Sequence, residues 1–290
     1  MIYPFIRKHR FQYGVEKLCT VMQVSRSGFY KWLVRTPSPR EIERKKRKKR
    51  IRDVFFLSKK RYGSPRITAV LKAEGMKISS KTVARLMKEM KLKSCMARKY
   101  KATTNSNHSM PVHENTLNRK FKVLAPNKVW VTDITYIRTR EGWLYLASVM
   151  DLFSRKIVGW STGARMTQEL VLDALDMAYK QQKPDPGLLH HSDRGSQYAC
   201  SEYQKRLAKY KMVGSMSRKG NCYDNSCIES FHSTLKKELV YVTTFKTREQ
   251  AQKELYTYIE FDYNRSRIHS TLGNKSPHQF EQLYFENLLA

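Results

Sequence analysis

The basic residues of this 290-residue chain are distributed unevenly, and this distribution limits what each part can fold into. Residues 1–125 contain 33 Lys and Arg against 7 Asp and Glu, whereas residues 126–290 contain 23 against 18. The formal net charge of +31 is therefore concentrated in the first part. Neutralising phosphates requires many cations, while chemistry requires few. The division predicts a nucleic-acid-binding arm joined to a domain with a different task.

So large an excess of positive charge favours a polyanionic partner, either nucleic acid or an anionic membrane surface. The most apolar stretch, 143–153, is broken by Ser148 and Asp151 and is shorter than the roughly 20 residues of a spanning helix. The basic N-terminus is followed by polar residues and does not resemble a signal peptide. The cysteines are five in number and scattered, which indicates reduced thiols. We therefore expect a soluble, cytoplasmic protein with no membrane partner.

The first 60 residues combine a short helical unit with a very basic run. Residues 14–34 predict two helices, the second capped by Ser25, so residues 1–36 are interpreted as a helix-turn-helix-like segment. The run Arg44–Arg50 is charged at every position and is either solvated or held against phosphate. We expect residues 37–60 to form a basic linker or helix, with a disordered linker as the alternative.

Residues 61–100 predict a helix-turn-helix DNA-binding domain. Ser64 is expected to cap a first helix, with Pro65 at its first position, that ends near Gly75. Ser79 or Ser80 caps a second helix with an apolar face formed by Val83, Leu86, Met87 and Met90. Its other face carries a cationic stripe suited to the DNA major groove, formed by Lys81, Arg85 and Lys88. A helix pair with ordinary solvated lysines is the alternative.

The rest of the chain predicts a linker and an α/β domain. Residues 101–123 are mostly polar and are expected to form the linker. Within 124–290, residues 129–137 alternate as a strand rich in β-branched and aromatic side chains. Further strands are expected at 143–152, 156–161 and 188–191, and helices at 167–180 and 224–240.

Three carboxylates of this domain are candidate metal ligands. Asp133 lies in mid-strand, where a half-buried charge is costly unless it is paired or bound to a metal. Asp193 follows a short strand, at the end where α/β sheets commonly place active groups. Glu229 lies on the 224–240 helix beside its apolar stripe, with Lys236 two turns further on nearly the same face. Such hard oxygen ligands suit Mg²⁺ or Mn²⁺, and a pair of these ions assists phosphoryl transfer.

The residues around these acids carry a specific resemblance. Asp133 in WVTDITYI, Asp193 in HHSDRGSQY and Glu229 in YDNSCIESFHSTLKKEL resemble the D,D(35)E signature of retroviral integrases and insertion-sequence transposases. The likeness covers most of residues 45–285 and includes VMDLFSRKIVGW, SRKGNCYDN, YNRSRIHSTLGNKSP and RYGSPRI. Within that superfamily the chain resembles the bacterial transposases encoded in two overlapping reading frames, as their second-frame product.

The resemblance implies an RNase H-like integrase catalytic core, a mixed five-stranded sheet with flanking helices, preceded by all-α helix-turn-helix modules. It implies that Asp133, Asp193 and Glu229 are the catalytic and metal-binding residues. It further implies two Mg²⁺ ions, for which Mn²⁺ substitutes, and a phosphate contact from Lys236, whose alternative is a solvated helix lysine. The enzyme would nick transposon ends with water and join the freed 3′-hydroxyl to another phosphodiester.

The partners implied by the resemblance are double-stranded DNA, at the terminal repeats and at the target, and further copies of the chain on that DNA. The upstream reading-frame product is a further expected partner, because a frameshift commonly fuses it to the second-frame product in this family. The expected location is the bacterial cytoplasm, associated with the nucleoid.

Other polar residues receive structural interpretations. The 224–240 helix is expected to be capped by Asp224 and Asn225. Asp151 is interpreted as a structural carboxylate, and a hydrogen-bonded structural role is also expected for His190 and His191. No second pair at zinc-site spacing accompanies Cys222 and Cys227, so zinc is not expected. Three tail residues either contact DNA or pack the last helix: Arg265, Arg267 and His269.

Two other functions compete with a transposase. A catalytically silent DNA-binding regulator of transposition would not need all three carboxylates, and all three are present. A structure-selective RNase H-like nuclease would need the same metals but no dedicated arm for DNA ends. We therefore favour the metal-dependent transposase.

Overall fold

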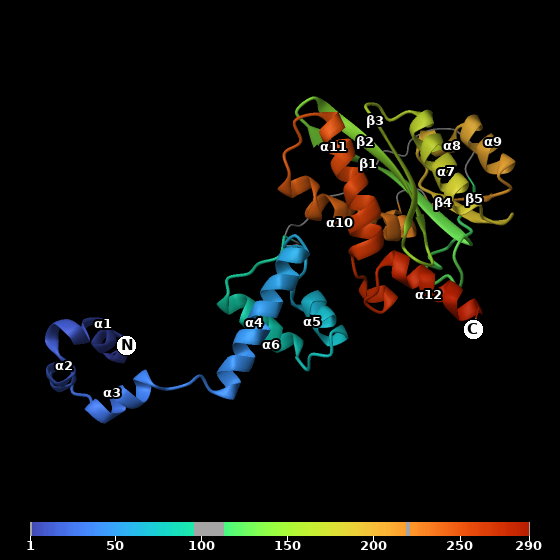
Figure 1. The fold of residues 1–290 in the computed structure, drawn as a ribbon. Coiled ribbons are helices and arrows are strands. Elements are labelled where there is room, and N and C mark those ends of the chain that lie inside the picture. Colours follow the sequence, from blue (N-terminus) through green and yellow to red (C-terminus); the bar gives the residue numbers. More distant parts are fainter. Residues whose placement is uncertain (1, 96–112, 219–220, 290) are drawn as a thin grey trace.

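The computed structural model describes residues 2–95, 113–218 and 221–289, and its centre is a five-stranded sheet (Figure 1). The strand order is β3-β2-β1-β4-β5. Strands β1 to β3 pair antiparallel, and β4 and β5 run parallel to β1. The bounds are Val129–Thr139 (β1), Gly142–Asp151 (β2), Ile157–Gly163 (β3), Leu189–Ser192 (β4) and Val213–Met216 (β5). The expected mixed five-stranded sheet is confirmed.

Strand β1 is much longer than its parallel neighbour. Strand β4 pairs only with Val129–Val131, so beyond that point no described strand of the sheet lies along this edge of β1. At the far end of β1, Thr139 forms a single bridge to Phe245. The middle of β1, which contains Asp133, is therefore approached from this side by helical and loop segments.

Helices cover both faces of the sheet (Figure 1). Helices α7 (Gln168–Gln182), α8 (Ser196–Ala199) and α9 (Ser201–Lys209) pack on one face, around a core that includes Trp130 and Leu175. Helices α10 (Ser226–Glu238) and α11 (Arg248–Thr257) pack on the other, around Val131 and Leu235. The remaining elements are η1 (Cys222–Asn225), η2 (Val240–Val242), the π-helix η3 (Tyr258–Ser266), η4 (Ser270–Leu272) and α12 (Pro277–Leu289).

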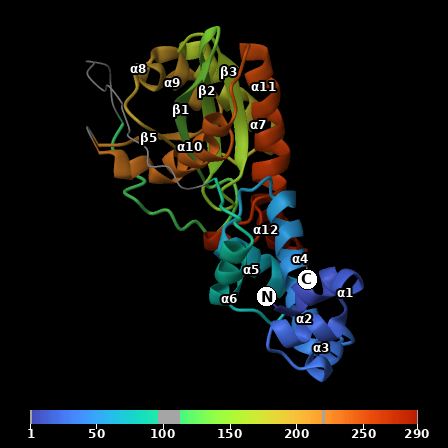
Figure 2. The same ribbon diagram turned by 90° about the vertical axis from the view of Figure 1, so that its left-hand side faces the viewer.

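Residues 2–95 form two helical modules with separate cores (Figure 2). The first contains α1 (Ile2–Tyr13), α2 (Val15–Val21) and α3 (Arg26–Leu33) around buried Ile6 and Phe29. Ser25 caps α3 by accepting a hydrogen bond from the Gly28 amide, as expected, whereas helix α1 was not anticipated. The second contains α4 (Pro39–Leu57), α5 (Ser64–Ala73) and α6 (Ser80–Glu89).

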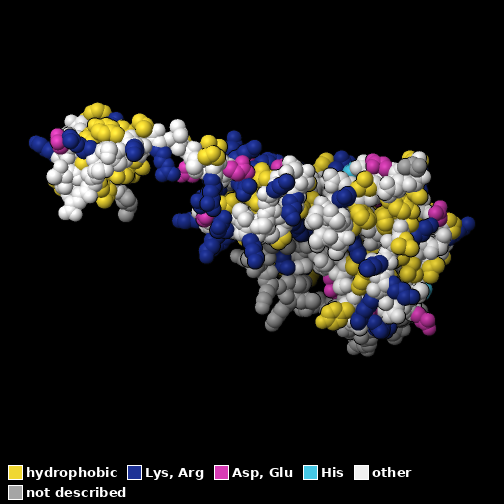
Figure 3. Space-filling model, turned by 90° about the horizontal axis from the view of Figure 1, so that it is seen from below, with side chains coloured by type: hydrophobic (Ala, Val, Ile, Leu, Met, Phe, Trp, Pro, Cys, Tyr) yellow, Lys and Arg dark blue, Asp and Glu magenta, His cyan; other side chains and the backbone are white. Residues whose placement is uncertain are grey.

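The basic run Arg44–Arg50 lies inside α4, so its interpretation as a disordered linker is wrong. Ser38 and Glu41 form a reciprocal capping box that starts this helix, with Pro39 at its first position. Four cations of the run are exposed, and the other three are partly buried; Arg44 and Lys48 pair with Glu89 of α6. Lys and Arg side chains crowd the surface of the second module (Figure 3). Helix formation therefore fixes the spacing of these charges along the axis of α4.

The helix-turn-helix segment departs from expectation at one cap. Ser64 is the first residue of α5, and Gly63 occupies the N-cap position without a side-chain hydrogen bond. Ser79 caps α6 by accepting from the Thr82 amide, which resolves the choice between Ser79 and Ser80. The expected apolar face of α6 packs into the module core, and its cationic stripe is exposed.

The second module is attached to the sheet domain through η3. Lys59 and Arg61 both pair with Asp262, at 2.9 Å and 2.7 Å. The Tyr62 hydroxyl donates to the Ser266 carbonyl and accepts from the Ile268 amide. Of the expected linker, residues 101–112 lie outside the described residues, while Leu117 is buried in the sheet domain. None of the described helices is both long and apolar enough to cross a membrane.

Candidate active site

Asp133 lies at the middle of β1, and its carboxylate is held by two contacts. Oδ1 accepts a hydrogen bond from the Ile134 amide at 2.8 Å, and Oδ2 lies 3.3 Å from Nδ1 of His232 on α10. The other ring nitrogen of His232 lies 3.2 Å from the hydroxyl of Ser148, the residue directly opposite Asp133 on β2. This Ser148–His232–Asp133 chain fixes the carboxylate. Sequence analysis missed His232, although its place one turn after Glu229 was visible.

Helix α10 brings Glu229 close to Asp133. Ile228, Phe231 and Leu235 bury one side of α10 against the sheet, and Glu229 follows in its first turn. Burial raises the pKa of Glu229 to about 7, and the negative charge of Asp133 adds to the shift. Burial is the larger cause of this shift, and the contribution of Asp133 shows that the two carboxylates lie within electrostatic range of each other.

Asp193 directly follows β4, and its Oδ1 accepts a hydrogen bond from the Gly195 amide at 2.9 Å. Burial raises the pKa of the Tyr198 hydroxyl well above its usual range. Tyr203 and the charges of Asp133 and Asp193 add smaller contributions, so both carboxylates lie near this hydroxyl. Across the described ranges, however, no three His, Cys, Asp or Glu side chains converge tightly enough to enclose a metal ion. Asp133 thus lies within electrostatic range of Glu229 and shares Tyr198 as a neighbour with Asp193.

Lys236 is buried, so the alternative interpretation of this residue as a solvated helix lysine is wrong. The residue is 4% exposed, and its Nζ lies 4.4 Å from the centre of the Tyr136 ring. Burial lowers the pKa of Lys236, while the nearby Tyr136 and Asp133 partly oppose that shift. Its ammonium group therefore sits over an aromatic face of β1, two turns beyond Glu229.

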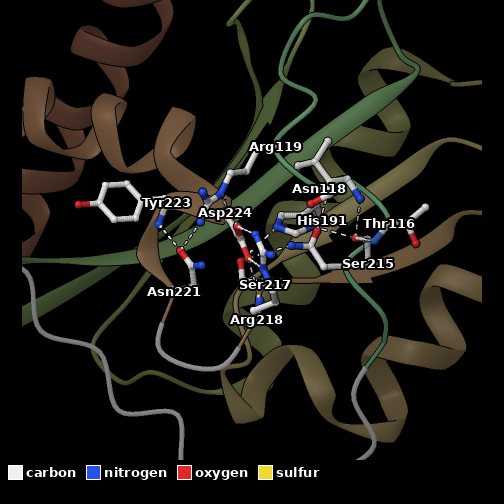
Figure 4. Close-up of polar contacts among 12 residues, drawn as sticks. Thr116, Asn118, Arg119, His191, Ser215, Ser217, Arg218, Asn221, Tyr223 and Asp224 are labelled. Carbon is white, nitrogen blue, oxygen red and sulfur yellow. Dashed lines mark hydrogen bonds and ion pairs between the residues drawn. The ribbon is translucent and has the colours of Figure 1, made fainter.

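The segment before α10 is held by a buried carboxylate, and this corrects the capping interpretation. Asp224 is fully buried and accepts hydrogen bonds from the guanidinium groups of Arg119 and Arg218, which converge on it from two segments (Figure 4). Asn225 does occupy the N-cap position, but its side chain makes no cap and donates to the Thr132 carbonyl. Both residues tie the start of α10 to the sheet.

Two histidines and Asp151 are structural, as expected. The ring of His190 contacts the Tyr203 hydroxyl, and that of His191 lies between the hydroxyls of Ser215 and Ser217 (Figure 4). Burial lowers the pKa of His190 to about 3 and that of His191 to about 4, so both are neutral near pH 7. Asp151 is buried and accepts hydrogen bonds from the Asn127 amide and from Ser154.

The tail residues mainly pack the domain. Arg267 is buried and pairs with Glu238, and its guanidinium also lies over the ring of Tyr263. His269 packs edge-on against Tyr263, whereas Arg265 is exposed. Cys227 accepts a hydrogen bond from Arg155, and the side chain of Cys222 lies outside the described residues.

Comparison with known families gives the class of this architecture. The family model "Integrase core domain" matches residues 124–222, a second model of the same description matches residues 210–277, and "HTH-like domain" matches residues 41–100. The protein is thus an integrase-type protein with a helix-turn-helix-like domain before its catalytic core.

Close relatives narrow the class. The chain is 44% identical, over 97% of its length and 98% of the relative, to "Transposase InsF for insertion sequence IS3A" of Escherichia coli (strain K12). It is 45% identical, over 93% of its length and 99% of the relative, to "Insertion element IS600 uncharacterized 31 kDa protein" of Shigella sonnei. The chain belongs to the family of IS3 insertion-sequence transposases.

Solved structures with a related chain path include two viral integrases. One is a simian T-cell lymphotropic virus intasome in complex with PP2A regulatory subunit B56 gamma, with a TM-score of 0.46 and 18% identity over 73% of this chain and 69% of that chain. The other is the HTLV-2 integrase catalytic core domain in complex with magnesium, with a TM-score of 0.43 and 19% identity over 55% of this chain and 98% of that chain.

We predict that Asp224→Asn lowers the free energy of unfolding by about 2 kcal/mol near pH 7, because it removes the charge of the buried carboxylate on which the half-exposed side chains of Arg119 and Arg218 converge. The two arginines hold the pKa of Asp224 far below its usual range. The stabilisation is therefore present above the unfolded-state pKa of about 4 and is lost as the pH falls. Urea unfolding followed by tryptophan fluorescence at pH 7 and at lower pH measures the difference.

The matched control is Asp185→Asn, which changes a carboxylate that is 84% exposed and whose ion-pair partner, among the described residues, is Lys128 alone. We expect this control to change stability by less than about 0.5 kcal/mol. Equal losses for both variants, or a loss for Asp224→Asn that does not shrink at low pH, contradict the role given to Asp224.

Proposed function

We propose that Asp133, Asp193 and Glu229 form the catalytic triad of a DNA transposase that performs metal-dependent 3′-end cleavage and strand transfer. The observation that carries the proposal is the place of Glu229 on α10, where burial, with a smaller contribution from the charge of Asp133, raises the pKa of Glu229 to about 7. Burying like charges beside each other is unfavourable unless a cation or a proton relieves the repulsion. Perturbed acids of this kind mark functional sites more often than structural ones.

The donor set of the site fits Mg²⁺. All three proposed ligands are carboxylates, the hard oxygen donors that Mg²⁺ and Mn²⁺ prefer. Within the described residues, the buried Oδ1 of Asn225 has no hydrogen-bond partner, and the same side chain donates to Thr132, the neighbour of Asp133. When bound, a pair of such ions activates the attacking oxygen and stabilises the leaving one.

The side chains of the protein position the reacting groups. His232, braced by Ser148, holds the Asp133 carboxylate in one orientation, and the packing of α10 holds Glu229 opposite it. In the first step, the oxygen of water bonds to a phosphorus at the transposon end, and the bond to the departing DNA strand breaks. In the second, the released 3′-hydroxyl attacks another phosphodiester and displaces a 3′-oxygen. No covalent protein intermediate is needed.

Glu229→Gln is predicted to abolish cleavage and joining while leaving DNA binding within about twofold, because the amide has nearly the same shape but lacks the charge. The assay uses labelled DNA from the ends of the element that surrounds the gene, with Mg²⁺ or Mn²⁺. Glu254→Gln, an exposed glutamate on α11, serves as the matched control and retains activity. End binding without any product in the wild-type chain, alone and fused to the upstream reading frame, favours the silent regulator.

His232 is proposed as a positioning residue, and its replacement separates orientation from packing. His232→Ala is predicted to lower the rate of strand transfer about 10-fold to 100-fold, the range seen when a group that orients a metal ligand is removed. His232→Asn keeps a donor near the position of Nδ1 and is expected to recover part of that loss. If the two variants are equally slow while their unfolding free energies match the wild type, the orientation argument fails.

The exposed stripe of α6 is proposed to bind the terminal repeats. Lys81, Arg85 and Lys88 are all exposed on the helix surface opposite the module core. The triple change to Gln is predicted to reduce the salt dependence of duplex binding, measured as log Kd against log salt, by about 3, because each phosphate contact contributes a slope of about 0.9. The control replaces three exposed lysines of the sheet domain: Lys180, Lys183 and Lys209. Equal slopes in both triple variants remove this assignment.

A further inference from the structure

A groove of about 610 Å³ lies between the β1–β2 hairpin and the segment that follows α10. It occupies the edge of β1 that β4 leaves uncovered, between the end of the β4 pairing and the bridge from Thr139 to Phe245. Three cations and three of its aromatic residues line it: Arg138, Arg140, Lys236, Tyr136, Trp143 and Tyr241. None of the lining residues is acidic, so the described walls attract an anion.

The geometry of β1 and β2 points the cations and aromatics into one place. Because side chains alternate along a strand, Tyr136 and Arg138 share one face of β1, and Arg140 follows in the turn after the strand; all three are exposed. Arg138 lies directly opposite Trp143 in the hairpin. Within the described residues neither Arg138 nor Arg140 forms an ion pair. Their guanidinium groups are therefore available to a ligand.

Two aromatic side chains of the groove are exposed to solvent. Trp143 is 46% exposed, and its ring packs edge-on against Tyr136 with centroids 5.1 Å apart. Tyr241 is 38% exposed, and burial together with the neighbouring Tyr136 raises its pKa. Exposed aromatic faces interleaved with arginines are the arrangement by which proteins bind single-stranded nucleic acid, since each base offers a face for stacking.

The groove begins near the proposed catalytic carboxylates. Tyr136 lies three residues beyond Asp133 on β1, and Lys236 lies seven residues beyond Glu229 on α10. Both separations correspond to roughly 10 Å along their elements. Three stacked nucleotides span a similar length, at about 3.4 Å each. Alternation places Asp133 and Tyr136 on opposite faces of β1, but Lys236 lies over the Tyr136 ring and within electrostatic range of Asp133, so the groove and the carboxylates meet at this lysine. A strand that reaches the carboxylates therefore has its next few nucleotides at the groove.

We propose that this groove binds unpaired nucleotides of a DNA strand next to the cleavage site, with bases stacked on Trp143 and Tyr241 and phosphates contacting Arg138 and Arg140. The inference rests on the proposed function and specifies the substrate of the same site as a locally single-stranded DNA end. In a fully paired duplex the base faces stack on each other, so they are not available to stack on Trp143 and Tyr241.

The test measures binding of a fluorescein-labelled oligothymidylate of eight nucleotides to the full chain, by anisotropy in EDTA so that no cleavage occurs. Trp143→Ala is expected to weaken binding about 10-fold, within the range for one lost stacking contact, and Trp143→Phe to retain most of it. The double change Arg138→Gln with Arg140→Gln is expected to lower the salt slope by about 1.4. Binding of the duplex terminal repeat should change less than twofold in all three.

Matched controls come from exposed positions elsewhere. Phe285→Ala removes an aromatic that is 48% exposed on α12, and the pair Lys183→Gln with Lys209→Gln removes two exposed cations. Neither is expected to affect the oligothymidylate. Unchanged binding in both groove variants overturns the inference, as does displacement of the oligothymidylate by an acidic peptide of equal charge, which marks a general anion site.

The same assay separates this inference from the proposed function. Glu229→Gln is expected to bind the oligothymidylate as the wild type does, because its carboxylate is not part of the groove. If the groove variants weaken oligothymidylate binding but the wild-type chain never cleaves DNA, the inference is supported and the proposed function is contradicted. If cleavage depends on Glu229 but the groove variants bind the oligothymidylate normally, the proposed function is supported and the inference is contradicted.

Discussion

The packing of helix α10 against the face of the sheet that contains β1 is the contact on which the site depends. Ile228, Phe231 and Leu235 are buried against the sheet, and this burial holds Glu229 beside Asp133 although their charges repel. Each fully buried side chain of this kind contributes about 2 kcal/mol, enough together to outweigh a repulsion that is itself eased by protonation. The raised pKa of Glu229 reflects the burial of its carboxyl group and, to a smaller extent, the repulsion from Asp133.

The position of α10 is secured at both of its ends by buried charge. Before the helix, Asp224 joins Arg218 to Arg119, which belongs to the segment entering the domain. At its end, Glu238 accepts from Arg267 and from the Tyr258 hydroxyl of η3. Pairs of this type give less net stability than apolar packing, but breaking one leaves an uncompensated charge. They therefore restrict the helix to one register against β1.

The same region connects the sheet domain to the DNA-binding arm. Asp262 of η3 pairs with Lys59 and Arg61, just after α4, and Glu238 lies 3.7 Å from Arg66 of α5. The helix that carries Glu229 thus ends on a cluster that also holds the second helical module. The contacts of Asp262 and Glu238 therefore join the helix-turn-helix-like module to the same end of the sheet domain that carries α10.

Local patterns in the sequence were sufficient for the charge division, the alternation of β1, the apolar face of α6 and the cap at Ser79, because each depends on residues close together along the chain. They failed at Ser64 and at Asp224, where a cap motif was present but the backbone or a distant arginine decided the outcome. The contact of His232 with Asp133, the burial of Lys236 over Tyr136 and the groove at the β1 edge were decided by tertiary structure alone. Each joins segments far apart in sequence, and no periodicity records which face of α10 meets which residue of β1.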